Sequence, residues 1–288
     1  MEGSTVNELR TIDLNGRQVA WAEYGDPGGV PVLLLHGTPG CRLGVAHHHE
    51  RYARQGLHVI APDRPGYGKT DPVPGRTLND VTVDNTAILD ALQLDDAFAV
   101  GVSGGGPHAL ALAAAAPTRV RAVGIIVGAA PLQSEEISAQ IEVNRAIASR
   151  LGDRTELRSY LETLRTTLLD EGLAAVLDDA PASDRAHWVK MAETSRRSIA
   201  EALAPGVQGM LYDYQAIFLH QWDFKLSQIN NPVVWAHGDD DRNVPITAAS
   251  RVAKHLPDCR FITWHGIGHA PGNDLLAEFY TRLLASRA

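Results

Sequence analysis

Three residue types that cooperate in nucleophilic catalysis occur along this chain in the order serine, aspartate, histidine. Ser103 is the centre of the sequence Gly-Val-Ser-Gly-Gly at residues 101–105, which has the pattern G-x-S-x-G. Further along, residues 237–245 contain three consecutive aspartates and residues 266–271 contain a Gly-His pair. A serine hydroxyl becomes a good nucleophile when a base takes its proton, and a carboxylate usually orients that base. Ser103 is therefore a candidate nucleophile, and its partners are expected in the two later segments.

The elements around Ser103 suit an exposed nucleophile. Residues 97–100 are apolar and predict a short buried strand, whereas residues 107–116 predict a helix. A serine between a strand and a helix can occupy a strained, sharp turn that pushes its hydroxyl out of the sheet. Glycine is needed two positions away on each side because a side chain there would collide with the neighbouring strand or helix.

The remaining elements predict a mostly parallel sheet. Asn15-Gly16 separates two strand-like runs, so the chain should open with an antiparallel hairpin. Asn79 is a candidate cap for a helix over 79–92. Helices alternate with apolar runs, a rhythm typical of parallel strands covered on both faces, at 30–35, 58–61, 97–102, 120–127, 233–237 and 260–264. The two later segments follow the last two runs, at the strand ends where such sheets bind ligands.

One long segment breaks this rhythm. Between residues 131 and 224 strand character is missing, and the pattern predicts helices only, at 134–151, 155–169, 182–203 and 206–222. Strands then return. We therefore expect one α/β core, formed by residues 1–130 and 225–288, that carries an inserted helical segment of residues 131–224.

Four motifs in order, spread over nearly the whole chain, resemble those of the α/β-hydrolase fold superfamily. They are H-G-x-P-G, D-x-x-G-x-G, the G-x-S-x-G nucleophile turn and G-x-x-D-x-x-V-P, at residues 36–40, 63–68, 101–105 and 238–245. A terminal Gly-His pair follows them. The resemblance implies an eight-stranded, mostly parallel sheet with antiparallel N-terminal strands and an all-helical cap.

The resemblance also implies individual roles. By this resemblance, Ser103 would be the nucleophile, His269 the general base and Asp241 the acid that orients it. The backbone amides of Thr38 and Gly104 would form the oxyanion hole. The spacing to Val244-Pro245 selects Asp241 for the acid. Asp239 and Asp240 are then turn formers or caps, because aspartate commonly bonds its own local backbone.

Composition excludes some other classes of protein. The 288 residues carry a net charge of −8 without a basic cluster, which argues against a nucleic-acid partner. No apolar run is long enough to span a membrane, and the first eight residues lack the pattern of a secretory signal. Only two cysteines occur, Cys41 and Cys259, so the fold does not depend on a disulfide framework and a cytoplasmic location is expected.

Several other residues have both a plain and a functional interpretation. Three adjacent histidines, at 47–49, cannot all face one ion on a regular element, so a surface helix is favoured over a metal site. His36 and His237 are expected to be structural. Cys41 and Arg42 are candidates for lining the pocket, although a buried thiol and a paired guanidinium are the commoner states.

These residues favour a serine hydrolase that cleaves a small to medium carboxylic ester or lactone through an acyl-enzyme. It would act on a small molecule and need neither a metal nor an organic cofactor; the oligomeric state stays open. The motifs and helical segment also resemble those of proline iminopeptidases and C-C bond hydrolases, which are alternative activities. Proline iminopeptidases, however, usually carry Trp where this chain has Gly104. A lyase, a cofactor-free oxygenase or a ligand receptor remains an alternative of another class, because fold does not fix reaction.

Overall fold

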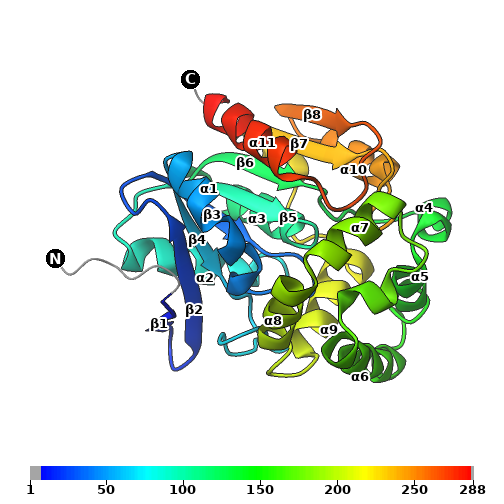
Figure 1. Ribbon diagram of the computed structural model, residues 1–288. Coiled ribbons are helices and arrows are strands. Elements are labelled where there is room, and N and C mark those ends of the chain that lie inside the picture. Colours follow the sequence, from blue (N-terminus) through cyan, green and yellow to red (C-terminus); the bar gives the residue numbers. More distant parts are fainter. Residues whose placement is uncertain (1–7, 287–288) are drawn as a thin grey trace.

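A computed structural model describes residues 8–286 and shows an eight-stranded sheet with helices on both faces (Figure 1). The strands lie in the order β1-β2-β4-β3-β5-β6-β7-β8; β1–β2 and β2–β4 pair antiparallel and all other neighbours pair parallel. Their bounds are Arg10–Asp13, Gln18–Gly25, Val30–Leu35, Leu57–Pro62, Ala97–Val102, Val120–Ile126, Val233–Gly238 and Cys259–Trp264 for β1 to β8. The predicted fold class is confirmed. The prediction that the first eight residues are not a secretory signal concerns mainly residues 1–7, which lie outside the described range.

The opening hairpin forms where the Asn-Gly pair predicts it. Asn15 has a φ of 57° and Gly16 a φ of 80°. Both central residues of a two-residue type I′ turn need positive φ, which asparagine and glycine tolerate best. The turn therefore joins β1 and β2 in the register that pairs Asp13 with Gln18.

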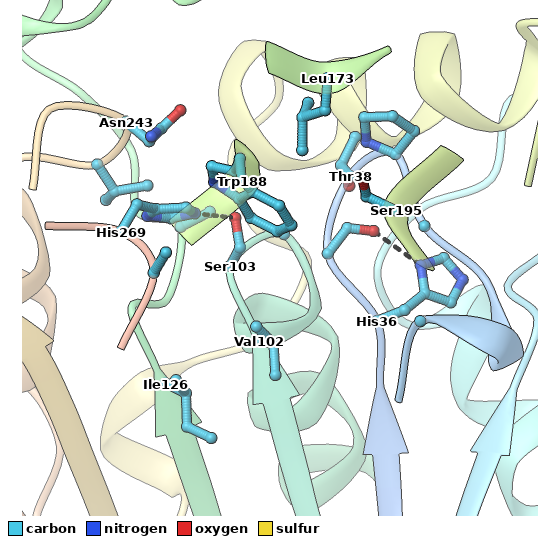
Figure 2. Close-up of a pocket in the computed structure, with 18 of the residues that line it drawn as sticks. His36, Thr38, Val102, Ser103, Ile126, Leu173, Trp188, Ser195, Asn243 and His269 are labelled. Atoms are coloured by element: carbon cyan, nitrogen blue, oxygen red, sulfur yellow. Dashed lines mark hydrogen bonds between the residues drawn. The ribbon is translucent and has the colours of Figure 1, made fainter. Parts of the chain in front are cut away.

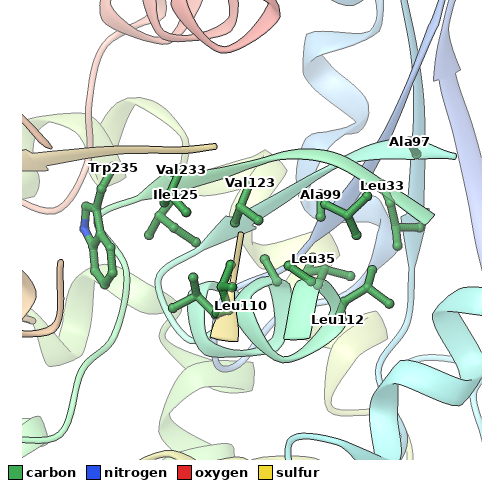
Figure 3. Packing of buried hydrophobic residues seen from close by; sticks show 14 of the residues in the cluster. Leu33, Leu35, Ala97, Ala99, Leu110, Leu112, Val123, Ile125, Val233 and Trp235 are labelled. Atoms are coloured by element: carbon green, nitrogen blue, oxygen red, sulfur yellow. The ribbon is translucent and has the colours of Figure 1, made fainter. Parts of the chain in front are cut away.

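The parallel strands are buried on both faces, and alternate side chains enter two separate cores. In β3, Leu33 and Leu35 face the helices α2 (Asp80–Ala91), α3 (Gly105–Ala115) and α10 (Ile246–Ala253). Figure 3 shows this packing, with Leu110 and Leu112 of α3 against the strands. Val32 and Leu34 enter the core on the other face, under α1 (His49–Arg54) and α11 (Asn273–Ala285). The short helices η1 (Arg42–His48), η2 (Pro117–Arg119) and η5 (Leu226–Gln228) complete this part of the fold.

Residues 131–224, all of which the structure describes, contain helices and no strand. The helices are α4 (Ser134–Ala139), α5 (Glu142–Ala148), α6 (Arg154–Asp170), η3 (Leu173–Val176), α7 (Ala182–Lys190), α8 (Ala192–Ala202), α9 (Gln208–Tyr214) and the π-helix η4 (Gln215–Leu219). They gather at one end of the sheet (Figure 1). We call residues 131–224 the helical insertion. Its apolar residues form a cluster that also includes Cys41 and Tyr67 from outside the insertion, and α6 contributes Leu157, Leu161, Leu164 and Leu168.

Three local predictions were wrong. The single helix predicted over 134–151 is two helices, α4 and α5, because Gln140 and Ile141 between them have extended backbone. The single helix predicted over 182–203 is two helices, because Met191 leaves helical geometry with φ −95° and ψ 11°. Asn79 precedes α2 but makes no capping bond with its side chain. Its side-chain amide instead donates to the carbonyl oxygen of Asp223 at 2.8 Å, so a contact with a distant segment displaces the local one.

Candidate active site

Ser103 occupies a sharp turn between β5 and α3. Its φ is 51°, a left-handed conformation that is costly for a residue with a side chain. The flanking glycines explain how the turn closes. A Cβ on Gly101 would lie 2.3 Å from the carbonyl oxygen of Gly105, at the start of α3, and a Cβ on Gly105 would lie 2.1 Å from the carbonyl oxygen of Leu35 in β3. Glycine at both positions therefore lets strand, turn and helix approach closely enough to hold Ser103 at the sheet end.

His269 joins Ser103 to one of the three consecutive aspartates. The Oγ of Ser103 lies 2.9 Å from Nε2 of His269 (Figure 2), and Nδ1 of His269 lies 2.7 Å from Oδ2 of Asp241. Asp239 instead accepts bonds from the amide of Gly266 and the ring of His265, and both Asp239 and Asp240 are exposed. Only Asp241 of the three thus faces the histidine.

Asp241 is held ionised and fixed in place. Its Oδ1 accepts the amides of Asn243 and Val244 at 2.8 and 2.9 Å, and Nε2 of His237 lies 3.2 Å from Oδ2. Burial opposes the charged form, but the charge of His269 and the hydrogen bond from His237 hold the pKa of Asp241 well below its usual range. The indole of Trp235 donates to Nδ1 of His237, so the ring proton that faces Asp241 is on Nε2, which also lies 2.8 Å from the carbonyl oxygen of Val244.

An aspartate of the helical insertion supports the loop of His269. Asp184, on α7, is fully buried and accepts the amides of His269 and Ala270 at 2.8 and 3.0 Å. Burial lowers the pKa of His269, but the charge of Asp241, its hydrogen bond and the charge of Asp184 together raise it above its ordinary value. Sequence reasoning missed Asp184, because an aspartate in the first turn of a helix has an ordinary role at that helix end.

Thr38 and Gly104 lie beside each other next to Ser103. A Cβ on Gly104 would lie 2.3 Å from Oγ1 of Thr38 and 3.3 Å from its amide nitrogen. In Figure 2, Ser103 lies between His269 on one side and Thr38 on the other. Residues from two separate loops therefore lie next to the Ser103 side chain. No side chain fits at Gly104 while Thr38 keeps this position.

A second buried aspartate of the insertion, Asp213 on α9, lies behind this loop. Its Oδ2 accepts the Thr38 hydroxyl at 2.7 Å and the Arg64 guanidinium at 2.6 Å, and Arg64 also donates to the carbonyl oxygens of His36 and Gly37. The other donors to Asp213 are Tyr67, Arg76 and His108. Although burial opposes ionisation, Arg64 and Arg76 hold the pKa of Asp213 well below its usual range. The insertion thus fixes the backbone of the Thr38 loop.

His36 serves this same loop as a neutral ring. Its Nε2 accepts the amide of Arg64 at 3.1 Å, so the proton is on Nδ1, which donates to the carbonyl oxygen of Gly37 at 2.7 Å. Burial and the charge of Arg64 keep its pKa well below the ordinary value. Both ring nitrogens are therefore engaged with the backbone, and His36 has no free nitrogen to act as a base.

Ser103 opens into a cavity of about 380 Å³ between the sheet and the insertion. Figure 2 shows Val102 and Ile126 on the strand side of Ser103, and Leu173 and Trp188 on the opposite side. The insertion supplies further apolar wall, including Ile137, Ile147, Leu177, Met191, Ile199, Tyr214, Ile217 and Phe218. Within residues 8–286, no aspartate or glutamate lines the cavity, and Arg51 is the one lysine or arginine that does.

Of the two candidates for lining the pocket, the structure places one in the wall. Cys41 lines the cavity as a buried thiol that donates to the carbonyl oxygen of Ser198, and burial raises its pKa to about 12. Arg42 is not part of the wall. Its guanidinium pairs with Asp63 and Glu201, each at 2.6 Å, because a buried cation needs nearby carboxylates.

No group of three or more histidine, cysteine, aspartate or glutamate side chains within the described range is arranged to hold a metal ion. Two of the three adjacent histidines, His47 and His48, line the cavity, whereas His49 accepts the amide of Gly25. Within the same range, none of the helices is both long and apolar enough to cross a membrane.

A family model described as alpha/beta hydrolase fold matches residues 30–271, so the chain belongs to the alpha/beta hydrolase fold family. It is 28% identical to a non-heme chloroperoxidase of Streptomyces lividans, over 88% of this chain and 90% of that one. It is 27% identical to a 2-hydroxymuconate semialdehyde hydrolase of Pseudomonas putida, over 88% and 87% of the two chains. The solved enol-lactonase from Burkholderia xenovorans LB400 has a similar fold, with a TM-score of 0.72 at 18% identity, covering 96% of this chain and all of that one.

Proposed function

We propose that this protein is a serine hydrolase that cleaves a small to medium carboxylic ester or lactone through an acyl-enzyme. The observation that carries the proposal is the continuous chain of hydrogen bonds from Ser103 through His269 to Asp241, facing an apolar cavity. Ser103 is the nucleophile, His269 the general base and Asp241 the acid that orients it. Membership of the alpha/beta hydrolase fold family supports this reading.

The proposed reaction follows from these contacts. Ser103 Oγ attacks the substrate carbonyl while its proton passes to Nε2 of His269, and Asp241 stabilises the resulting imidazolium. The amides of Thr38 and Gly104 stabilise the negative oxygen that forms. His269 then protonates the departing alcohol, which leaves the acyl group on Ser103. Water, activated by the same histidine, releases the acid and restores the serine.

The helical insertion, residues 131–224, acts in this proposal as a lid on a core formed by residues 1–130 and 225–288. It supplies much of the apolar cavity wall, and a lid that excludes water strengthens the electrostatic interactions of the reacting groups. Asp184 and Asp213 link it to the His269 and Thr38 loops.

An ester or lactone suits the cavity better than a peptide with a free N-terminal proline. A protonated amine needs a carboxylate partner when it is buried, and none of the described residues that line the cavity is acidic. A side chain in place of Gly104, such as the Trp usual in proline iminopeptidases, would collide with Thr38. The lack of an acidic residue in the described lining favours a substrate without a cationic amine, and Gly104 separates this chain from the usual proline iminopeptidase pattern.

A test combines chemical labelling with a substrate panel. A fluorophosphonate probe should add once to the wild-type protein, measured by intact mass, and not to Ser103→Ala or His269→Ala. The wild type should hydrolyse chromogenic esters faster than a proline anilide, and Ser103→Ala should not. A folded wild-type protein that takes no label would contradict the proposed nucleophile and favour a non-hydrolytic member of the family. Faster cleavage of the anilide would overturn the substrate class.

A further inference from the structure

Arg51 is half-buried and lines the cavity, and unlike the buried Arg42, Arg64 and Arg76 it has no carboxylate partner within residues 8–286. Arg42, Arg64 and Arg76 each contact an aspartate within 2.6 Å. Arg51 makes no such pair anywhere in residues 8–286; its Nη1 donates to the neutral side chain of Asn273 at 3.2 Å, and its guanidinium lies 5.1 Å from the centre of the Tyr52 ring. Its Nε is buried and has no hydrogen-bond partner. Among the described residues, the Arg51 guanidinium therefore has no anionic partner.

The groups around Arg51 do not supply that anion. His47 and His48 of η1 and His187 of α7 line the same end of the cavity. Burial together with the charge of Arg51 lowers the pKa of His47 to about 4 and that of His48 to about 2, so both rings are neutral near pH 7. The nearby Asp184 interacts with His187, but its two oxygens already accept the amides of the His269 loop.

An apolar surface surrounds this end of the cavity. Asn273, which bonds Arg51, is followed on α11 by Leu276 and Tyr280, and spacings of three and four place all three on one face of the helix. Tyr280 packs edge-on against Tyr52, with ring centres 5.7 Å apart. Val45, Val102 and Ile126 also line the cavity, the last two on the strand side of Ser103 (Figure 2). The same cavity therefore contains the reactive serine, apolar walls and one unpaired cation.

We propose that Arg51 binds a carboxylate of the substrate, so that the preferred ester or lactone carries a second, ionised carboxyl group separated from the reacting carbonyl by an apolar segment. This inference rests on the proposed hydrolysis at Ser103. A planar guanidinium can donate two parallel hydrogen bonds to a carboxylate, and the neutral rings of His47, His48 and His187 can add further bonds. Because no aspartate or glutamate among residues 8–286 lines the cavity, the described wall does not repel such a group.

The test compares charged and uncharged esters of equal length. Monomethyl esters of straight-chain dicarboxylic acids, from succinic to sebacic, place the carboxylate on the acyl side, whereas acetoxyalkanoates place it on the alcohol side. The dimethyl esters and the methyl acetoxyalkanoates are the uncharged partners. At its best length, the wild type should show a higher kcat/KM for the charged ester on one of the two sides.

Arg51→Met should lower kcat/KM for the preferred charged ester roughly 10- to 100-fold, because a hydrogen-bonded charge pair is lost. It should leave the uncharged ester within about twofold. Arg54→Met is the matched control, since Arg54 lies exposed on the same helix and its loss changes the net charge equally. The idea is overturned if the wild type does not prefer the charged ester, if Arg51→Met slows both esters alike, or if Arg54→Met has the same effect.

A binding measurement separates this inference from the proposed reaction. Ser103→Ala, titrated calorimetrically with each charged ester of the two series, should bind at least one of them, and adding Arg51→Met, but not Arg54→Met, should weaken that binding roughly 10- to 100-fold. Fluorophosphonate labelling and hydrolysis of the uncharged esters report on the reaction alone. If labelling fails but the titration gives the expected result, the carboxylate subsite is supported and the proposed reaction is contradicted. If the double variant Ser103→Ala, Arg51→Met binds the charged ester as well as Ser103→Ala does, the subsite is contradicted.

Discussion

At the scale of single residues, the hydrogen bonds of Asp184 could not be predicted from the sequence. It touches backbone rather than another functional side chain, and its two acceptors hold the amides of His269 and Ala270. Its charge also contributes to raising the pKa of His269. Asp184 is thus a positioning residue that acts on both the place and the proton affinity of the proposed base.

Asp184→Asn should lower kcat roughly 10- to 100-fold with little change in KM, because an amide group would face one of the two backbone donors and shift the His269 loop. It should also change the pH profile. His269 must be neutral to accept a proton, so kcat/KM of the wild type rises through a midpoint above the ordinary histidine pKa of 6.5. Removing a charge that raises this pKa moves the midpoint to lower pH.

The control for this variant is Asp178→Asn, which removes the same charge from an exposed site in the insertion. Kinetics across pH for both variants decide the matter. A fall in kcat with an unmoved midpoint would show that Asp184 only supports the fold, and equal effects of both substitutions would point to net charge alone.

At the scale of elements, the turn that carries Ser103 depends on backbone contact between a strand and a helix. A Cβ on Gly105 would meet two backbone carbonyl oxygens at the end of the neighbouring strand β3, at 2.1 Å for Leu35 and 2.8 Å for His36. Backbone atoms in the middle of a sheet cannot move aside independently. The turn is therefore limited by packing as well as by the φ of Ser103.

Gly105→Ala should destabilise the fold by about 3 kcal/mol or more, because the added methyl group overpacks a rigid contact. Gly152→Ala, where a Cβ would meet nothing within 4 Å, should change stability by less than about 0.5 kcal/mol. Urea unfolding of both variants compares the two positions. Similar midpoints for the two proteins would mean that the close approach at Gly105 is not a constraint.

The sequence predicted the features that depend on neighbouring residues better than those that depend on distant contacts. The strands, the Asn15-Gly16 hairpin and the α/β order follow from neighbouring residues, and the structure contains them. Asn79 does not cap its helix because its side chain bonds Asp223 instead. Arg42 does not line the cavity because its guanidinium pairs with Asp63 and Glu201. All three partners are distant in the sequence. The site roles themselves came from motif order, whereas Asp184 and Asp213 depend on how the insertion packs.

At the scale of the whole molecule, Asp213 joins the insertion to the sheet. It is fully buried and receives two guanidinium groups, from Arg64 and Arg76. Breaking such a cluster by removing its anion leaves two buried cations without compensation. The packing of the insertion on the sheet and the stability of the protein should therefore change together.

Asp213→Asn should cost about 3–5 kcal/mol of unfolding free energy at neutral pH. The pKa of Asp213 is lower in the folded protein than in the unfolded chain, where it is near 3.8. Its stabilising effect is thus complete above that value and is lost as the pH falls through the folded pKa. Urea midpoints followed from neutral to acid pH should decline less steeply in the variant than in the wild type; parallel curves would contradict the assignment.

The two aspartates of the insertion also bear on how freely this family can exchange its parts. Asp184 and Asp213 reach the His269 and Thr38 loops from separate helices, α7 and α9. A chimera that replaced residues 131–224 with the corresponding segment of another family member would remove both carboxylates along with the cavity wall. A donor segment that carries a new specificity must therefore also supply a hydrogen-bond acceptor to each loop. The residues of the cavity wall can be exchanged more freely than these two aspartates.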